Sequence, residues 1–561
     1  MHSWRWRARV AALLVAAGLV GGARLLPAAG DPPAPVEYRL AVVAPDEHRL
    51  DVELLLPDLP TTPLELQMSV ASPGRYALHD FVRGVSALAV TDTEGRPLAV
   101  TAAPGGWTVA AHPSAVRVRY RVRGERVDGT YLAVDGTHAH INMPAALVWA
   151  RGLERRAVRV SFQAPASTSA SASTAWRVAT QLLPTASPLT FTAPNLQYLM
   201  DSPAEFSAFS SRTFVVRDRE RSATFRLALH DTGTAADADA YARDLEAIAG
   251  EATAVFGALP AFESPEYTFI ADFLPDASGD GMEHRNSTVL TSSASIAAAR
   301  RPLAEKGAHE VFHAWNIERI RPRSLEPFAF DRANVSGELW LGEGVTNYYG
   351  HLLTVRAGIV PLTAVAATFG EAIDQVVRST ARQRRSVVEM SRLAPLTDGA
   401  GPESRAGIEG GFLSYYTWGE TIGLALDLTL RQRSNHAVSL DSVMRHLWER
   451  FGAHRGEPGE VARPYEEADV EAALAEVSGD AVFARTFMDR YVRGRDVPDF
   501  AALLAPAGFV LQDRRAANPP ARPEAPLLAV VPVERTGRLT AAQRAFREQW
   551  AGTKRVPVRQ Q

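Results

Sequence analysis

Apolar and polar residues alternate along much of the first part of the chain. Every second residue of Val116–Arg123 is apolar and the residues between are arginines, and Arg49–Leu55 and Ala157–Phe162 alternate in much the same way. This period of two is typical of a strand with one buried and one solvated face. Turn signals such as Asp128-Gly129 separate the strands. We therefore predict an N-terminal antiparallel β-sandwich over residues 36–209, which supports the rest and shapes one wall of a cleft.

The pattern changes at about residue 210. Thr224–Leu229 and Tyr267–Phe273 have the pattern of strands, whereas apolar residues recur at helical spacing in Ala235–Phe256. Further helices are expected at Ser439–Gly452, Glu466–Val477 and Val482–Tyr491. These elements predict a multidomain α+β protein, with a second, α/β domain over residues 210–511 that is helical in its C-terminal half.

Segments of biased composition mark loops. Ala166–Ala175 consists of Ser, Thr and Ala, and we predict a loose surface loop there. Leu396–Gly411 is rich in glycine and charge, and we expect a mobile loop near the cleft. Residues 512–561 begin with a Pro/Ala/Arg-rich stretch, for which we predict a flexible tail with one short helix, Thr540–Trp550.

A pair of histidines with a glutamate between them lies in a predicted helix, Ala304–Ile317. His309 and His313 are four residues apart, about one turn, so both imidazoles can reach one metal ion. Glu310 lies beside them, where its carboxylate can contact a water on the metal. A catalytic zinc has three protein ligands and keeps one position for water, so one ligand remains to be found.

Glu343 is the best candidate for the third ligand. It lies thirty residues after His313 on a second apolar segment with helical character, which ends near Gly358. Packed against the first helix, this segment would complete a set of two histidines and one glutamate around a single Zn²⁺ per chain. Asn347 follows one turn later, where its side-chain carbonyl could accept the free ring N–H of a histidine ligand.

The surrounding motifs carry a resemblance. They are His309–Pro322, Leu325–Phe328, Leu339–Tyr349, Gly281–Ser287, Ser414–Gly419 and Ser439–Trp448. In these motifs the chain resembles the glycyl aminopeptidase-like family of zinc metallopeptidases, and a weaker similarity extends over about residues 36–511. The resemblance implies a thermolysin-like catalytic domain over residues 210–511. Many relatives carry a C-terminal PDZ domain, but the last fifty residues are too few for a complete one.

The resemblance also implies roles for further residues. Related aminopeptidases bind the substrate's amino group through a Gly-x-Met-Glu-Asn type motif, so Gly281, Met282 and Glu283 are expected to line the substrate site. Their tyrosine three residues before a glycine matches Tyr416, which would donate to the oxyanion that forms during attack, with Tyr415 as the alternative. The family usually has lysine where this chain has Trp418.

These observations predict a zinc aminopeptidase that acts on peptides, with Glu310 as general base and a preference, implied by the family, for N-terminal Gly or Ala. One alternative is an endopeptidase on the same metal site. Another is a non-catalytic binding protein whose metal is structural, although a structural zinc has no use for the general base Glu310.

Composition and the N-terminus bear on location and partners. A hydrophobic content of 46% is ordinary for a folded soluble protein, and a net charge of −3 gives no electrostatic reason to expect nucleic acid as a partner. Arginines followed by the apolar run Val10–Val20 and small residues indicate a signal peptide over residues 1–29. We expect a periplasmic or secreted mature chain without a membrane span, and an uncleaved anchor is the alternative. There is no cysteine, hence no disulfide, and no feature indicates an oligomeric state.

Overall fold

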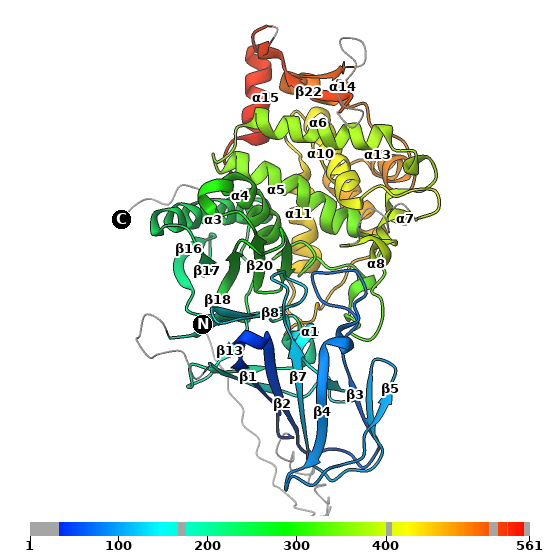
Figure 1. Cartoon of the computed structure of the whole chain (residues 1–561). Helices are drawn as coiled ribbons and strands as arrows, with labels where there is room; N and C mark the ends of the chain where they lie inside the picture. Colours follow the sequence, from blue (N-terminus) through cyan, green and yellow to red (C-terminus); the bar gives the residue numbers. More distant parts are fainter. Residues whose placement is uncertain are drawn as a thin grey trace, which may run out of the picture.

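The computed structural model describes residues 33–165, 175–399, 405, 407–514, 526–535 and 537–554. A β-rich part, blue and cyan in Figure 1, lies below a part that is mostly helical. Each part has a hydrophobic core of its own. One is built almost entirely from residues 36–206, and the other extends from Phe214 to Ala551 and also includes Tyr76. The two cores support the domain boundary expected near residue 209, which stays a prediction.

The largest sheet of the β-rich part has seven strands. Its order is β13 (Leu183–Pro184), β14 (Thr190–Ala193), β11 (Val158–Gln163), β1 (Val36–Ala44), β2 (Arg49–Leu56), β7 (Val116–Arg123) and β4 (Val85–Asp92). β7 has the bounds that its alternation predicts, and its apolar side chains are buried. The expected antiparallel pairing fails at one place, because β1 and β11 are parallel. Strands so far apart in sequence are joined by a long crossover, which permits either direction.

Two four-stranded sheets complete this part. One has the order β10 (Trp149–Ala150), β3 (Leu64–Gln67), β6 (Gly106–Val109) and β5 (Thr101–Ala103). The other has the order β12 (Arg177–Thr180), β15 (Ala204–Ser207), β9 (His138–Ile141) and β8 (Leu132–Val134). This last sheet contacts the helical part, because β12 lies against β18 (Glu266–Phe273).

A five-stranded sheet begins the second part. Its order is β16 (Ser210–Arg217), β17 (Ser222–Asp231), β18, β20 (Ser287–Ser292) and β19 (Gly281–His284). β17, β18 and β20 are parallel, and β19 is an antiparallel edge strand. The crossover from β17 to β18 contains α3 (Ala235–Phe256), which has the predicted bounds; Thr234 caps its N-terminus and Gly257 ends it in the left-handed conformation that glycine favours.

The helix with the histidine pair differs in extent from its prediction. α4 runs from Ile296 to Phe312, starting earlier and ending earlier than Ala304–Ile317. Its backbone is kinked at Ala299, so Pro302 falls in the first turn after the kink, where a missing N–H costs little. His313 follows the last turn but keeps helical backbone angles, φ −62° and ψ −21°, so the one-turn spacing to His309 is preserved.

The helices that follow α4 pack around the hydrophobic core of the second part. They are a π-helical turn, η4 (Trp340–Gly344), followed by α5 (Val345–Arg356), α6 (Leu362–Arg378), α7 (Val387–Ser391), α8 (Ala394–Thr397), α10 (Tyr415–Ser434), α11 (Leu440–Leu447), α12 (Glu467–Ser478), α13 (Ala481–Phe487) and α14 (Phe500–Leu504). No helix in the described ranges has the length and apolar character needed to cross a membrane.

The C-terminal segment differs from the predicted flexible tail. β21 (Phe509–Asp513) pairs with β22 (Leu528–Pro532), and α15 (Ala541–Ala551) follows at the upper end of Figure 1. Phe546 and Trp550 of α15 are buried in the main core. The helix has the predicted position, but its apolar stripe is covered, so this segment belongs to the folded part of the protein.

Two sequence predictions fall outside the described residues. They are the signal peptide, residues 1–29, and nearly all of the loop Ala166–Ala175.

Candidate active site

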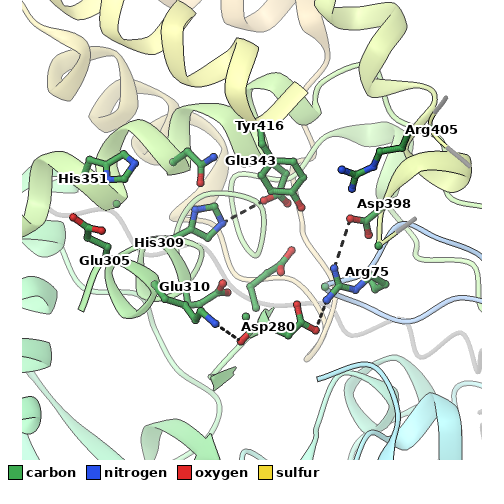
Figure 2. Close-up of a pocket in the computed structure, with 17 residues that line it drawn as sticks. Arg75, Asp280, Glu305, His309, Glu310, Glu343, His351, Asp398, Arg405 and Tyr416 are labelled. Carbon is green, nitrogen blue, oxygen red and sulfur yellow. Dashed lines mark hydrogen bonds and ion pairs between the residues drawn. The ribbon is translucent and has the colours of Figure 1, made fainter. Parts of the chain in front are cut away.

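Three side chains converge at the end of α4. His309 Nε2 lies 2.9 Å from His313 Nε2, and Glu343 Oε2 lies 3.5 and 3.3 Å from these two nitrogens. A tetrahedral zinc with ligands at roughly 2.0–2.2 Å separates its ligand atoms by about 3.3–3.6 Å. The two separations from Glu343 match this range, and the two imidazole nitrogens would move apart by about 0.4 Å to hold one ion. His313 and Glu343 are buried, whereas His309 is partly exposed to a cavity of about 450 Å³ (Figure 2).

A hydrogen-bonded clamp fixes the two elements that carry these ligands. The backbone carbonyl of Asn316 accepts from His313 Nδ1 at 2.9 Å, which fixes the ring and leaves Nε2 free for a metal. The side-chain amide of Asn316 donates to the carbonyl of Leu341 and to the hydroxyl of Thr346, both at 2.9 Å. One residue thus ties the end of α4 to the π-helical turn that contains Glu343, an irregularity often found at functional sites.

Asn347 has a different place from the predicted one. It lines the cavity, but the partner of His313 Nδ1 is the Asn316 carbonyl, and no described residue forms a hydrogen bond to His309 Nδ1. Asn316 is the third residue after His313, so the end of the helix itself supplies the acceptor that we had expected from the side chain of Asn347.

Glu310 lies against the edge strand β19. A Cβ built on Gly281 would overlap the Glu310 carboxylate, so the glycine permits this close approach. Glu310 is buried, and no described residue forms a hydrogen bond to its Oε2. Burial raises the pKa of this carboxyl, and the nearby carboxylate of Glu343 raises it further. Glu310 therefore lies beside the paired imidazoles with its carboxyl pKa raised above the usual value.

Glu283 lies deeper in the same site. A carboxylate oxygen of Glu283, one of Glu310 and a nitrogen of His313 lie within 4.8 Å of one another. Burial raises the pKa of Glu283 well above its usual value, with a further contribution from Glu343. Three carboxyl groups thus surround two histidines, and this concentration of negative potential favours cations, either a metal ion or a substrate ammonium group.

Tyr416 is the tyrosine that lines the cavity. Its ring faces His309, with a centroid separation of 6.4 Å, and Figure 2 shows it on the same side of the cavity as Glu343. Tyr415 packs behind it at 4.8 Å, with its hydroxyl buried and without a hydrogen-bond partner among the described residues. Trp418, where the family usually has lysine, is buried in the core.

Close helix packing brings α10 to this place. A Cβ on Gly344 would overlap Gly419, and a Cβ on Gly419 would overlap the carbonyl of Trp340. Two glycines therefore let the backbone of α10 touch the π-helical turn, and Tyr416 comes to lie beside Glu343 as a result.

A loop from the β-rich part completes the site, and sequence reasoning missed it. The hydroxyl of Tyr76 donates to Glu343 Oε1. Arg75 forms ion pairs with Asp280 and Asp398 (Figure 2), and the backbone N–H of Tyr76 donates to Asp398 at 2.9 Å. Gly74 has φ +77° and lies against Met282 and Glu283. The glycine and Pro73 mark a turn in the sequence, but nothing local indicates its distant partner.

The expected loop after α8 lies at the cavity. Asp398, Gly399 and Arg405 line it, within the segment predicted from its glycine and charge content. Asp398 accepts from the Tyr76 backbone and pairs with Arg75, so this end of the loop is held in place by the β-rich part.

Comparison with known proteins agrees with the geometry. Residues 37–208 match the Peptidase M61 N-terminal domain, and residues 303–422 match the M61 glycyl aminopeptidase domain. Together the matches cover more than half of the chain. The chain belongs to the M61 glycyl aminopeptidase family and is a peptidase of the zinc metallopeptidase class. This membership disagrees with the alternative of a non-catalytic binding protein.

One solved structure shares the fold over most of the chain. An aminopeptidase N family protein from Idiomarina loihiensis is 23% identical, with a TM-score of 0.73 over 85% of this chain and 79% of its own. An M1 zinc metallopeptidase from Deinococcus radiodurans is 16% identical, with a TM-score of 0.47 over 83% of this chain and 95% of its own. Among curated proteins, none matches this sequence.

Proposed function

We propose that the protein is an exported aminopeptidase that removes N-terminal residues, preferably Gly or Ala, from peptides. His309, His313 and Glu343 would hold one zinc ion. The observation that carries the proposal is the convergence of these three side chains beside a buried Glu310 and Glu283, in one cavity. A metal site that was only structural would have no need of these two additional carboxyl groups.

When bound, zinc supplies polarisation of the scissile carbonyl and lowers the pKa of water to about 7. Glu310, pressed against Gly281, takes the proton from the attacking water and passes it to the leaving amine. Tyr416 donates a hydrogen bond to the oxyanion from the opposite side of the cavity. Glu283 binds the ammonium group of the substrate, which places the first peptide bond at the reacting centre and excludes longer N-terminal extensions.

Hydrolysis of Gly- and Ala-peptides by the purified protein tests the proposal. Chelation should abolish release of the N-terminal residue and zinc should restore it. Glu310→Gln should bind zinc normally but lose turnover by about 10²–10⁴-fold. Tyr416→Phe should lower kcat, whereas Tyr415→Phe should change it little because the Tyr415 hydroxyl does not line the cavity. A fully active Glu310→Gln enzyme would refute the mechanism.

Blocked substrates separate this activity from the alternative of an endopeptidase. An aminopeptidase should cleave free peptides and reject N-acetylated ones, and Glu283→Ala should raise KM for free peptides. Efficient cleavage of N-acetylated peptides that is indifferent to Glu283→Ala would establish the endopeptidase instead. Mass spectrometry of the protein recovered from its native host tests export, because a mature chain should begin close to residue 30.

A further inference from the structure

A second cluster of metal-ligating side chains lies where the β-rich part meets the catalytic sheet. It consists of His140 on β9, Glu205 on β15 and Asp272 on β18, and one ligand atom of each lies within 4.8 Å of the others. His140 and Glu205 are directly opposite each other in their antiparallel pair. Asp272 projects from the facing sheet. In Figure 1 this junction lies near the labels of β8 and β18. It shares no residue with the active site.

The distances in the cluster resemble those of the catalytic ligands. His140 Nδ1 lies 3.4 Å from Asp272 Oδ2 and 3.9 Å from Glu205 Oε2. These values are close to the separation of about 3.3–3.6 Å that a tetrahedral ion imposes on its ligand atoms. A further nitrogen is at hand, since His230 Nδ1 lies 4.0 Å from Asp272 Oδ1.

The polar atoms of the cluster lack hydrogen-bond partners among the described residues. All three side chains are fully buried. Neither ring nitrogen of His140 and none of the four carboxylate oxygens of Glu205 and Asp272 has a hydrogen-bond partner among the described residues. Burying an ionisable group without a partner is strongly unfavourable, so a folded protein retains such a group only when something compensates it.

The charges point to a cation. Two carboxylates and a neutral imidazole carry a charge of −2, which one divalent ion neutralises. One imidazole and two carboxylates are ligands that zinc accepts.

We infer that His140, Glu205 and Asp272 form a second, structural zinc site that joins the β-rich part to the catalytic sheet. Two of its ligands come from strands before residue 210 and one from β18, so a bound ion fixes one part against the other. Such a site binds metal outside the catalytic cavity and does not depend on the proposed aminopeptidase activity.

Zinc stoichiometry tests this site. The full chain is freed of metal with a chelator, reloaded with Zn²⁺ alone, and dialysed, and the zinc bound per chain is measured by elemental analysis. The wild-type protein should bind two equivalents. Glu205→Gln and Asp272→Asn should each bind one. Asp135→Asn is the matched control, because Asp135 contacts His138 at the edge of the cluster but offers no ligand atom to it, and it should retain two.

A catalytic-site variant separates the two zinc ions. His313→Ala should keep one equivalent, and His313→Ala combined with Glu205→Gln should keep none. Anomalous scattering from wild-type crystals at the zinc edge covers the case in which a variant fails to fold, and a peak should lie between His140, Glu205 and Asp272. A single equivalent in the wild type, or no peak at this place, would overturn the inference and leave a shared proton in the cluster.

Discussion

Among single residues, Tyr76 has the most informative contact, because it joins the proposed metal ligand Glu343 to a distant part of the chain. Removing its hydroxyl leaves one carboxylate oxygen unpartnered and free to rotate. We expect Tyr76→Phe to weaken zinc binding or peptide hydrolysis by about 10–100-fold, which is typical for loss of a group that orients a ligand. Zinc affinity is measured by competition with a chelator.

Tyr120→Phe is the matched control for this change. Tyr120 is equally buried in the β-rich part, but its hydroxyl bonds to backbone groups of Ala146 and Val148, away from the cavity. It should lower stability and leave zinc affinity unchanged. Equal zinc affinities of Tyr76→Phe and wild type, with equal activity, would show that the contact does not matter for the site.

Glu420 gives a prediction about pH. It is buried on α10, 3.6 Å from His351, and burial is the main reason that its pKa is raised to about 8. Burial also lowers the pKa of His351 to about 4, so both groups are uncharged at neutral pH. Glu420 keeps its proton up to about pH 8 in the folded protein but releases it near 4.5 when unfolded. Its contribution to stability is therefore complete below pH 4.5 and decreases as pH rises to 8.

Glu420→Gln should remove this dependence. At pH 8 the variant should be more stable than wild type by at least about 1 kcal/mol, because each pKa unit corresponds to about 1.4 kcal/mol. At pH 4 the two should be equal. Denaturant unfolding of the metal-free proteins at both pH values measures the difference, because zinc would dissociate from protonated histidines at pH 4. Parallel pH profiles would contradict the prediction.

Among the elements, the edge strand β19 sets the position of the general base. A Cβ at Gly281 would overlap Glu310, so Gly281→Ala must displace that carboxylate or the strand. We expect kcat to fall by at least about tenfold, as small displacements of catalytic groups cost this much or more, while zinc content stays the same. Steady-state kinetics and elemental analysis measure the two quantities.

Gly279→Ala is the control for this substitution, because a Cβ at Gly279 has no atom within 4 Å and the residue precedes the same strand. It should leave kcat within about twofold. If Gly281→Ala were as active as Gly279→Ala, the close approach of β19 to Glu310 would have no catalytic importance.

The elements also show what a sequence pattern can reveal. β7 and α3 have their predicted bounds because each repeats one period over many residues. α4 was harder to delimit, since the kink at Ala299 lets a proline lie inside a helix. The parallel pair β1 and β11 has no local signal at all, because pairing across so long a connection depends on the whole sheet.

For the molecule as a whole, the folded C-terminal segment is a structural requirement. Trp550 is fully buried, its Nε1 donates to the Tyr348 hydroxyl at 2.9 Å, and its carbonyl accepts from Arg356 at 3.1 Å. Trp550→Ala should cost about 3–5 kcal/mol of unfolding free energy, as expected for a large core residue. Thermal or denaturant unfolding measures the loss.

The conservative variant Trp550→Phe retains an aromatic ring and should lose distinctly less. KM for peptides should be unchanged in both variants at temperatures where they remain folded, because the residue is not in the cavity. If the Trp550→Ala protein were as stable as wild type, the last helix would not unfold together with the core and would behave as a flexible tail.

The whole site could be predicted only in part. His309, Glu310, Glu343, Glu283 and Tyr416 line one cavity, and His313 is buried directly beside it. Each of the six lies in a short motif of recognisable chemistry. Arg75 and Tyr76 reach the cavity from far away in the sequence and lie in no such motif. His140 lies on a strand next to no metal-binding motif, and its partners Glu205 and Asp272 come from distant strands, so the sequence gives no local signal for this cluster.

The π-helical turn at Trp340–Gly344 has a consequence for any relative or redesign of this protein. A π turn encloses one residue more than an α turn, and each helical residue advances the chain by about 100° around the axis. Deleting a single residue there would swing Glu343 away from the two imidazoles even with every side chain intact. The number of residues in this turn therefore sets the direction in which the Glu343 carboxylate points. A relative that has the glutamate but a turn of different length would not have an equivalent site.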